Sequence, residues 1–138
     1  MKLFVDANTL ISGLLFPGNE RLLLELGRYG TCELVTNEYV RGEVADFLVR
    51  PRVRLSGNDR RRLMTILDRT VIVLESPPSE KVHKARGRLS DPEDLPVLVG
   101  FEISGGDYLV TGDKGLRRAT SRGISTRRAL ELLLGEFE

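Results

Sequence analysis

The chain has 138 residues, of which 41% are hydrophobic and 30% charged, and its formal net charge is +1. This is the length of one domain, so we expect residues 1–138 to form a single domain whose core needs no disulfide or metal. No apolar run approaches the ~20 residues of a membrane span, the N-terminus has no signal-peptide pattern, and Cys32 is the only cysteine. We therefore expect a cytoplasmic protein without disulfide bonds or membrane contact.

Short apolar runs alternate along the chain with stretches of helical periodicity. Strands are expected at residues 2–6, 32–35 and 71–74, in a run ending near Thr111, and near Ile124. Helices are expected at residues 10–16, 20–28, 37–49, 56–68, 95–104 and 127–134. The basic segment that follows Ser76-Pro77-Pro78 is expected to be mostly irregular. This order predicts an α/β fold with three layers, α/β/α, around a central parallel sheet of four to five strands.

Local signals set several of these boundaries. Thr36 or Asn37 is a suitable N-cap for helix 37–49, and Arg50-Pro51 ends that helix. Ser56, with Asp59 three residues later, resembles a capping box. The continuous β-branched run at residues 71–74 predicts a buried strand.

Two of the expected strands end on an aspartate. Asp6 closes the first strand, and Asp113 follows Val110-Thr111-Gly112 at the end of a later one. In parallel sheets, ligands bind in the crevice beyond the carboxyl ends of the strands. Two carboxylates that meet there repel each other, which favours a divalent metal between them. Capping of the next helix is the structural alternative for Asp6.

The other residues of this strand end have separate expectations. Thr111 is placed to orient one of the carboxylates by a hydrogen bond, and Gly112 permits a tight turn and close approach of a ligand. Asp107, at the other end of the same strand, should point away from the crevice and is excluded from the site.

Glu43 lies at the edge of an apolar stripe on helix 37–49. The stripe consists of Val40, Val44, Phe47 and Leu48. Glu38 and Asp46 project elsewhere and should face solvent. A carboxylate at the margin of a buried face needs a partner. Metal binding and a salt bridge with an arginine are equally supported for Glu43 at this point.

Asp94 precedes Pro96, which fits the first turn of a helix. Asp94 is therefore both a candidate metal ligand and a natural N-cap. Asp91 is suited to capping a turn before Pro92, and we place it outside the set of direct ligands.

The available side chains narrow the chemistry. With one histidine and one cysteine, a zinc site of the usual nitrogen and sulfur kind is excluded. His83 lies in a charged segment and has no convincing serine or cysteine nucleophile to pair with. Carboxylate ligands select Mg²⁺ or Mn²⁺, which retain bound waters and engage phosphate oxygens. The acidic residues thus favour metal-dependent phosphodiester hydrolysis.

Cations gather in three runs, at residues 50–62, 81–88 and 117–128, and arginine far outnumbers lysine. The planar guanidinium suits phosphate oxygens. Charge patterning alone supports a phosphate-binding surface and a solvated charged surface equally. If the surface binds a nucleic-acid backbone, the expected contacts are Arg50, Arg52, Arg54, Arg117 and Arg118.

Four motifs in order along the chain resemble the PIN-domain nucleases. They are Phe4-Val5-Asp6-Ala7-Asn8, Glu43 on its helix, Asp94 in Asp91-Pro92-Glu93-Asp94-Leu95-Pro96, and Leu109-Val110-Thr111-Gly112-Asp113. The resemblance implies an acidic pocket that binds Mg²⁺ or Mn²⁺ and cleaves single-stranded RNA. It also implies that Asp6, Glu43, Asp94 and Asp113 are catalytic metal ligands, directly or through water, with Asn8 and Thr111 supporting them.

The resemblance extends to VapC-like toxins, in particular the branch with a Thr-Gly-Asp ending and a proline-rich approach to Asp94. For such proteins a homodimer and a silencing antitoxin are expected partners, and RNA, single-stranded or structured, is the expected substrate.

Three other functions compete with this one. A phosphatase of the haloacid dehalogenase type requires a second aspartate where this chain has Asn8, and a receiver domain requires adjacent acids early in the chain. A non-catalytic RNA-binding or assembly scaffold remains the alternative. Such a scaffold would still bind RNA after metal removal or mutation of the acids, whereas cleavage by a nuclease would be lost.

Overall fold

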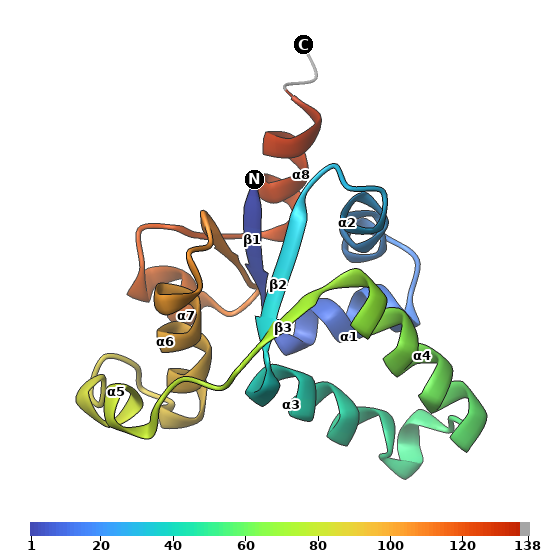
Figure 1. The fold of residues 1–138 in the computed structure, drawn as a ribbon, viewed down its shortest axis with the longest axis horizontal. Coiled ribbons are helices and arrows are strands. Elements are labelled where there is room, and N and C mark those ends of the chain that lie inside the picture. The colour runs from blue at the N-terminus through green and yellow to red at the C-terminus, as the bar shows by residue number, and fades with distance from the viewer. Residues whose placement is uncertain (136–138) are drawn as a thin grey trace.

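The computed structural model describes residues 1–135 and contains a five-stranded, all-parallel sheet with strand order β3-β2-β1-β4-β5 (Figure 1). The strands are β1 (Lys2–Val5), β2 (Glu33–Asn37), β3 (Ile72–Leu74), β4 (Tyr108–Val110) and β5 (Gly123–Ile124). Helices cover the sheet on both sides, with α1, α2 and α4 on one side in Figure 1 and α5, α6 and α7 on the other. The predicted α/β fold with a parallel sheet is confirmed.

The six expected helices are present, with boundaries close to those predicted, and the structure contains further helical segments besides. The helices are α1 (Ala7–Leu15), α2 (Asn19–Arg28), α3 (Glu38–Leu48), α4 (Gly57–Thr70), α5 (Ser79–Lys84), α6 (Leu95–Ser104), α7 (Lys114–Ala119) and α8 (Thr126–Leu134), with the short 3₁₀ helices η1 (Pro51–Val53) and η2 (Pro92–Asp94). Asn37 caps α3 and Ser56 caps α4, each accepting a backbone N–H at 3.0 Å. Within residues 1–135, no helix has both the length and the hydrophobicity needed to cross a bilayer.

The central strands hold the site in place. Leu3, Phe4 and Val5 of β1 are fully buried, and the Phe4 ring packs edge-to-face on Phe101 of α6 with centroids 6.4 Å apart. Val5 pairs with Val110 of β4, so the residues that follow these two lie side by side at the carboxyl edge of the sheet. Burial of such side chains stabilises the fold by about 1.5–3 kcal/mol each. The carboxyl edge of the sheet is therefore held in place by the buried strands β1 and β4.

The strand predicted to be buried at residues 71–74 is instead an edge strand. β3 pairs only with β2, and Ile72 is 50% exposed. A continuous β-branched run predicts a strand but does not determine its position in the sheet. Here the strand order leaves one side of β3 unpaired.

Two helices depart from the sequence-based expectation. The basic segment expected to be irregular contains α5, because Ala85 packs against Leu95 and Val99 of α6 in a small second core and holds the segment in place. Helix α7 was not expected; the Asp113 side chain caps its first turn.

Candidate metal centre at the carboxyl edge of the sheet

Asp6 is held rigidly at the end of β1. Its side chain is only 5% exposed, and Oδ1 accepts the Thr9 N–H at 3.0 Å, which caps α1. Oδ2 accepts a hydrogen bond from the Thr111 hydroxyl. The capping alternative is thus correct, yet each carboxylate oxygen retains a further lone pair for a cation. Capping and metal binding are therefore compatible at this position.

Thr111 connects the two strand-end aspartates. It is fully buried, donates to Asp6, and accepts the Asp113 backbone N–H at 3.0 Å on the same hydroxyl oxygen. Asp113 in turn caps α7 by accepting the Leu116 N–H at 2.9 Å. Thr111 thus makes a hydrogen bond of the predicted kind to a carboxylate, and its single hydroxyl links β1 to the β4–α7 turn. The supporting role of Thr111 at a metal stays a prediction.

Asp94 is not a cap, contrary to one of its two predicted roles. Its carboxylate makes no capping hydrogen bond to α6, because the preceding residues form η2 and leave Asp94 with helical backbone angles of φ −86° and ψ −7°. Side-chain capping requires an extended residue. Asp91 fulfils that requirement and accepts the Glu93 N–H at 2.9 Å, as predicted. The Asp94 carboxylate is therefore free for another partner.

Charge repulsion links the four predicted acids through Asp94. Burial raises the pKa of Asp94 to about 6, and the negative charges of Asp113, Asp91 and Asp6 add to the shift. The pKa of Glu43, on the solvent-accessible face of α3, is also raised, first by partial burial and then by Asp94 and Asp6. The ends of β1 and β4, helix α3 and η2 thus bring their carboxylates close enough to repel one another.

No cation within residues 1–135 neutralises these acids. The ion pairs of this part of the chain are Lys2–Glu33, Arg41–Asp68, Arg88–Glu102 and Arg128–Glu131. The salt bridge considered for Glu43 is therefore not formed. Carboxylates that repel one another and have no cationic partner offer the oxygen donors that a divalent cation requires.

The acids do not form a closed cage. In residues 1–135, no three acidic, histidine or cysteine side chains lie close enough together to hold one metal ion as they stand. Mg²⁺ is commonly bound by one or two carboxylates and retains several waters, so these residues suit an open, water-rich site. The role of the four acids as ligands stays a prediction.

Three further residues support the site and were missed as such from the sequence. Asn37, besides capping α3, donates from Nδ2 to the Pro96 carbonyl at 3.2 Å and so ties α3 to the start of α6. Thr36 donates to the Val5 carbonyl at 2.9 Å. Tyr39 donates to the Glu93 carbonyl at 2.6 Å. The capping pattern identified Asn37 but contained no signal for its second bond.

Comparison with known proteins identifies the family. A family model of the PIN domain matches residues 2–115. The chain belongs to the PIN-domain family. The members of this family are generally nucleases, which agrees with an acidic centre at the carboxyl edge of the sheet. No curated protein sequence matches this PIN domain.

Several solved structures share its fold. PAE2754 from Pyrobaculum aerophilum superposes with a TM-score of 0.73 at 23% identity, covering 97% of this chain and 96% of its own. VapBC2 from Rickettsia felis, solved with a DNA fragment from its promoter, gives 0.68 at 12% identity, covering 91% and 98%. FitAcB from Neisseria gonorrhoeae gives 0.58 at 15% identity, covering 89% and 96%. At these identities the likeness shows the fold alone.

The remaining predicted residues lie on the helices of the PIN domain and at their ends. Asn8 is exposed in the first turn of α1, and Glu38 and Asp46 face solvent as expected. Arg117 and Arg118 occupy the last turn of α7, the helix that Asp113 caps. The arginines beyond the end of α3 are exposed, namely Arg50, Arg52 and Arg54. The Arg50 guanidinium lies 5.1 Å from the Phe47 ring centre.

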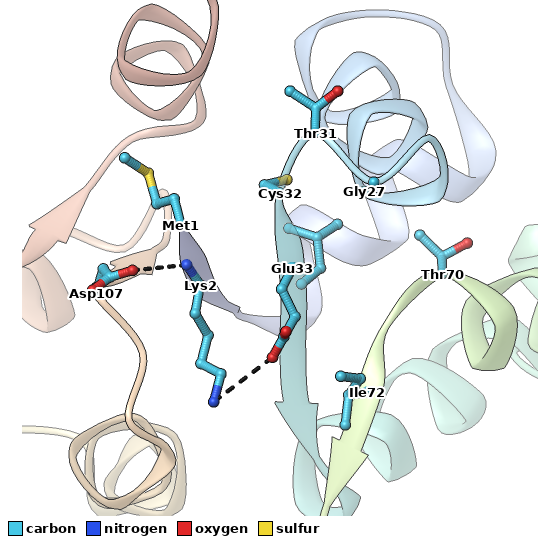
Figure 2. Close-up of a pocket in the computed structure, with 11 residues that line it drawn as sticks. Met1, Lys2, Gly27, Thr31, Cys32, Glu33, Thr70, Ile72 and Asp107 are labelled. Carbon is cyan, nitrogen blue, oxygen red and sulfur yellow. Dashed lines mark hydrogen bonds and ion pairs between the residues drawn. The ribbon is translucent and has the colours of Figure 1, made fainter.

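A large hollow lies at the opposite edge of the sheet (Figure 2). Its volume is about 630 Å³, and its lining includes Met1, Lys2, Cys32, Glu33 and Asp107. Asp107 accepts the Lys2 backbone N–H at 2.7 Å, so its exclusion from the acidic centre is confirmed. Lys2 also pairs with Glu33 at 3.7 Å. The charged side chains at the amino edge of the sheet thus have partners there, and this edge is separate from the four acids.

The Asn37 side chain joins α3 to the start of α6 through two hydrogen bonds, here called the Asn37 brace. This brace leads to a stability prediction at Gly100 of α6. A Cβ at position 100 would collide with the Asn37 amide, which is buried and bonded at both ends. We expect Gly100→Ala to destabilise the fold by about 1–3 kcal/mol in urea unfolding, through strain and loss of the Asn37 hydrogen bond. Gly42→Ala on α3 is the matched control, because a Cβ there meets nothing within 4 Å. This control should stabilise by up to ~1 kcal/mol, and equal midpoints for the two variants would contradict the brace.

Proposed function

We propose that this PIN domain is a metal-dependent endoribonuclease that hydrolyses phosphodiester bonds of single-stranded RNA with Mg²⁺ or Mn²⁺. The observation that supports the proposal is that Asp94 and Glu43 feel the negative charges of Asp6 and, for Asp94, of Asp113, while no cation among residues 1–135 pairs with these acids. Asp6 and Asp94 are the primary ligands in this proposal, and Glu43 and Asp113 complete the set directly or through water. When bound, a divalent ion supplies activation of water and neutralisation of charge at the phosphate.

The protein's own groups prepare this centre. Thr111 and the Thr9 N–H fix the Asp6 carboxylate, so little reorganisation is needed when a ligand arrives. Asn37 and Tyr39 hold α3 against the η2–α6 segment, which sets the distance between Glu43 and Asp94. The raised pKa of Asp94 keeps its carboxylate receptive to a proton or a cation near neutral pH.

The arginines beyond α3 and at the end of α7 are the proposed contacts to the RNA backbone. Arg50, Arg52 and Arg54 lie in and beside η1, and Arg117 and Arg118 lie in the last turn of α7, the helix that Asp113 caps. Their forked donors suit phosphate oxygens, and they would offset the repulsion between the acids and RNA.

The biological setting is part of the same proposal. The Thr-Gly-Asp ending and the proline-rich approach to Asp94 resemble VapC-like toxins, and the fold is shared with VapBC2 and FitAcB. We propose a cytoplasmic toxin of a toxin–antitoxin pair that forms a homodimer and is silenced by an antitoxin protein.

The test is cleavage of a mixed pool of single-stranded RNA with Mn²⁺, with Mg²⁺ and with a chelator. The wild-type protein is expected to cut only with metal, and Asp6→Asn should not cut. Asp107→Asn, the same change at the other edge of the sheet, should cut like wild type. RNA that is bound but remains intact with every metal would favour the non-catalytic scaffold, and cutting by Asp6→Asn would refute the site.

Thermal unfolding should report the metal through its pH dependence. The pKa values of Asp94 and Glu43 are raised on folding, so their contribution to stability is full below their unfolded pKa values and is lost as pH rises through about 6, the folded value for Asp94. A divalent ion binds the ionised forms. We therefore expect Mn²⁺ at 100 times its Kd to add ~2.7 kcal/mol near pH 8 and little near pH 5.

Other carboxylates change stability with pH in the opposite direction, and their effect must be subtracted from the measured pH dependence. Arginine partners lower the pKa values of Asp68 and Glu102, which reduces stability in acid. The quantity to compare is therefore the change in Tm on adding Mn²⁺ at each pH. A change of equal size at pH 5 and pH 8 would contradict binding by these carboxylates.

A further inference from the structure

A groove lies beside the acidic centre, between α3, the β3–α5 connection and the η2–α6 segment. Its volume is about 460 Å³, within the ~300–1,000 Å³ range of small-molecule sites. Its walls include Tyr39, Pro77, His83, Arg86, Pro92 and Pro96. Two aromatic rings, three proline rings and one guanidinium group thus line a single hollow.

The groove and the acids share structural elements. Tyr39 lies one helical turn before Glu43, on the same face of α3. Its hydroxyl bonds to the Glu93 carbonyl, one residue before Asp94. The two prolines of the floor, Pro92 and Pro96, flank Asp94 in the chain. An RNA strand whose phosphate reached the acids would therefore have a neighbouring base within reach of the groove.

The chemistry of the walls matches a nucleobase. Aromatic rings and guanidinium planes stack on bases of any sequence. His83 and Arg86 are exposed on the rim, with Arg86 Nη1 3.5 Å from His83 Nδ1. The same helix also carries Lys81 and Lys84, which project from α5 without lining the groove. This basic rim beside an acidic centre is complementary to a phosphate backbone whose bases turn inward.

We propose that this groove binds one nucleobase of the RNA strand adjacent to the phosphate held at the acidic centre, and that its walls set the base preference of cleavage. The inference rests on the proposed function in taking RNA as the substrate. It gives the second basic run of the sequence, at residues 81–88, a specific role that the arginines near residues 50 and 117 do not share.

The test compares two double variants of the same basic segment, residues 81–86. His83→Ala/Arg86→Ala removes the rim of the groove, and Lys81→Ala/Lys84→Ala removes two positive charges from α5 but leaves the groove intact. All four positions are exposed, so both proteins should fold. Binding of short adenylate, uridylate and cytidylate oligoribonucleotides is measured by fluorescence anisotropy in chelator, which makes binding independent of cleavage. Cleavage of the same oligoribonucleotides is then measured with Mn²⁺.

We expect the His83/Arg86 variant to bind about 5- to 100-fold more weakly, the range for loss of one stacked base, and to change its order of preference among the three sequences. The Lys81/Lys84 control should weaken all three equally and lose part of its salt dependence. Equal losses in both variants, or no loss in either, would overturn the groove as a base site. A change in the oligomeric mass of the His83/Arg86 variant, with RNA binding unaltered, would overturn it in favour of a contact between protein copies.

The same data separate this inference from the proposed function. Oligoribonucleotide binding that depends on His83 and Arg86, without cleavage in any metal, would support the base site and refute the ribonuclease. Cleavage with the same sequence preference in wild type and in the His83/Arg86 variant would support the ribonuclease and refute the base site.

Discussion

Asp94→Asn is expected to abolish RNA cleavage and, at the same time, to make the metal-free protein more stable. The loss of a metal-binding carboxylate should lower the rate by about 10³-fold, equivalent to ~4 kcal/mol of transition-state stabilisation. Burial and four neighbouring acids raise the Asp94 pKa to about 6, so the ionised side chain opposes folding at pH 7.5. After allowance for solvent screening of this half-buried group, its removal should add on the order of 1 kcal/mol, or about 3–5 °C in Tm.

The opposite signs distinguish a functional from a structural aspartate. Substitution of a residue that only supports the fold lowers the activity of the protein because it lowers its stability. Single-turnover cleavage and thermal unfolding in chelator, with Asp107→Asn as the matched aspartate, provide the two readouts. An Asp94→Asn protein that is both inactive and less stable than wild type would show that Asp94 supports the fold rather than the chemistry.

Thr111→Val should produce the second large effect. The change keeps the shape of a fully buried side chain but removes the hydroxyl that Asp6 and the Asp113 N–H both use. An unsatisfied buried N–H and the lost donor should destabilise the fold by about 2–4 kcal/mol. Loss of a hydrogen bond that orients a ligand should weaken metal affinity or activity by about 10- to 100-fold.

The conservative variant Thr111→Ser is the control, because it restores the hydroxyl and omits only a methyl group. Urea unfolding and Mn²⁺-dependent cleavage should place the serine variant much closer to wild type than the valine variant. Equal losses of activity in Thr111→Ser and Thr111→Val would indicate that packing of the methyl group, not the hydrogen bond to Asp6, matters at this position.

Much of the fold could be predicted because its signals are local. The apolar run that ends on Asp6 and the one that ends near Thr111 predict strands, and helices between them predict a parallel sheet. The placement of both aspartates at the carboxyl edge then follows from topology. The capping residues Asn37 and Ser56 were likewise readable, since each acts on an N–H three residues away.

What could not be predicted depends on contacts between distant segments. The strand order places β3 at the edge of the sheet, and only packing on α6 makes the basic segment at α5 helical. Asp94 has the sequence of an N-cap, but η2 changes its backbone angles and frees its carboxylate. The second bond of Asn37, to the Pro96 carbonyl, joins residues 59 positions apart and leaves no local pattern.

Direct titration of Mn²⁺, followed by electron paramagnetic resonance near pH 8 without RNA, tests the central claim that these acids form a metal centre. The account predicts saturable binding by the wild-type protein and by Asp107→Asn, and binding at least ~10-fold weaker in both Asp6→Asn and Asp94→Asn. Undiminished Mn²⁺ affinity in those two variants, or no saturable binding by the wild type, would contradict it.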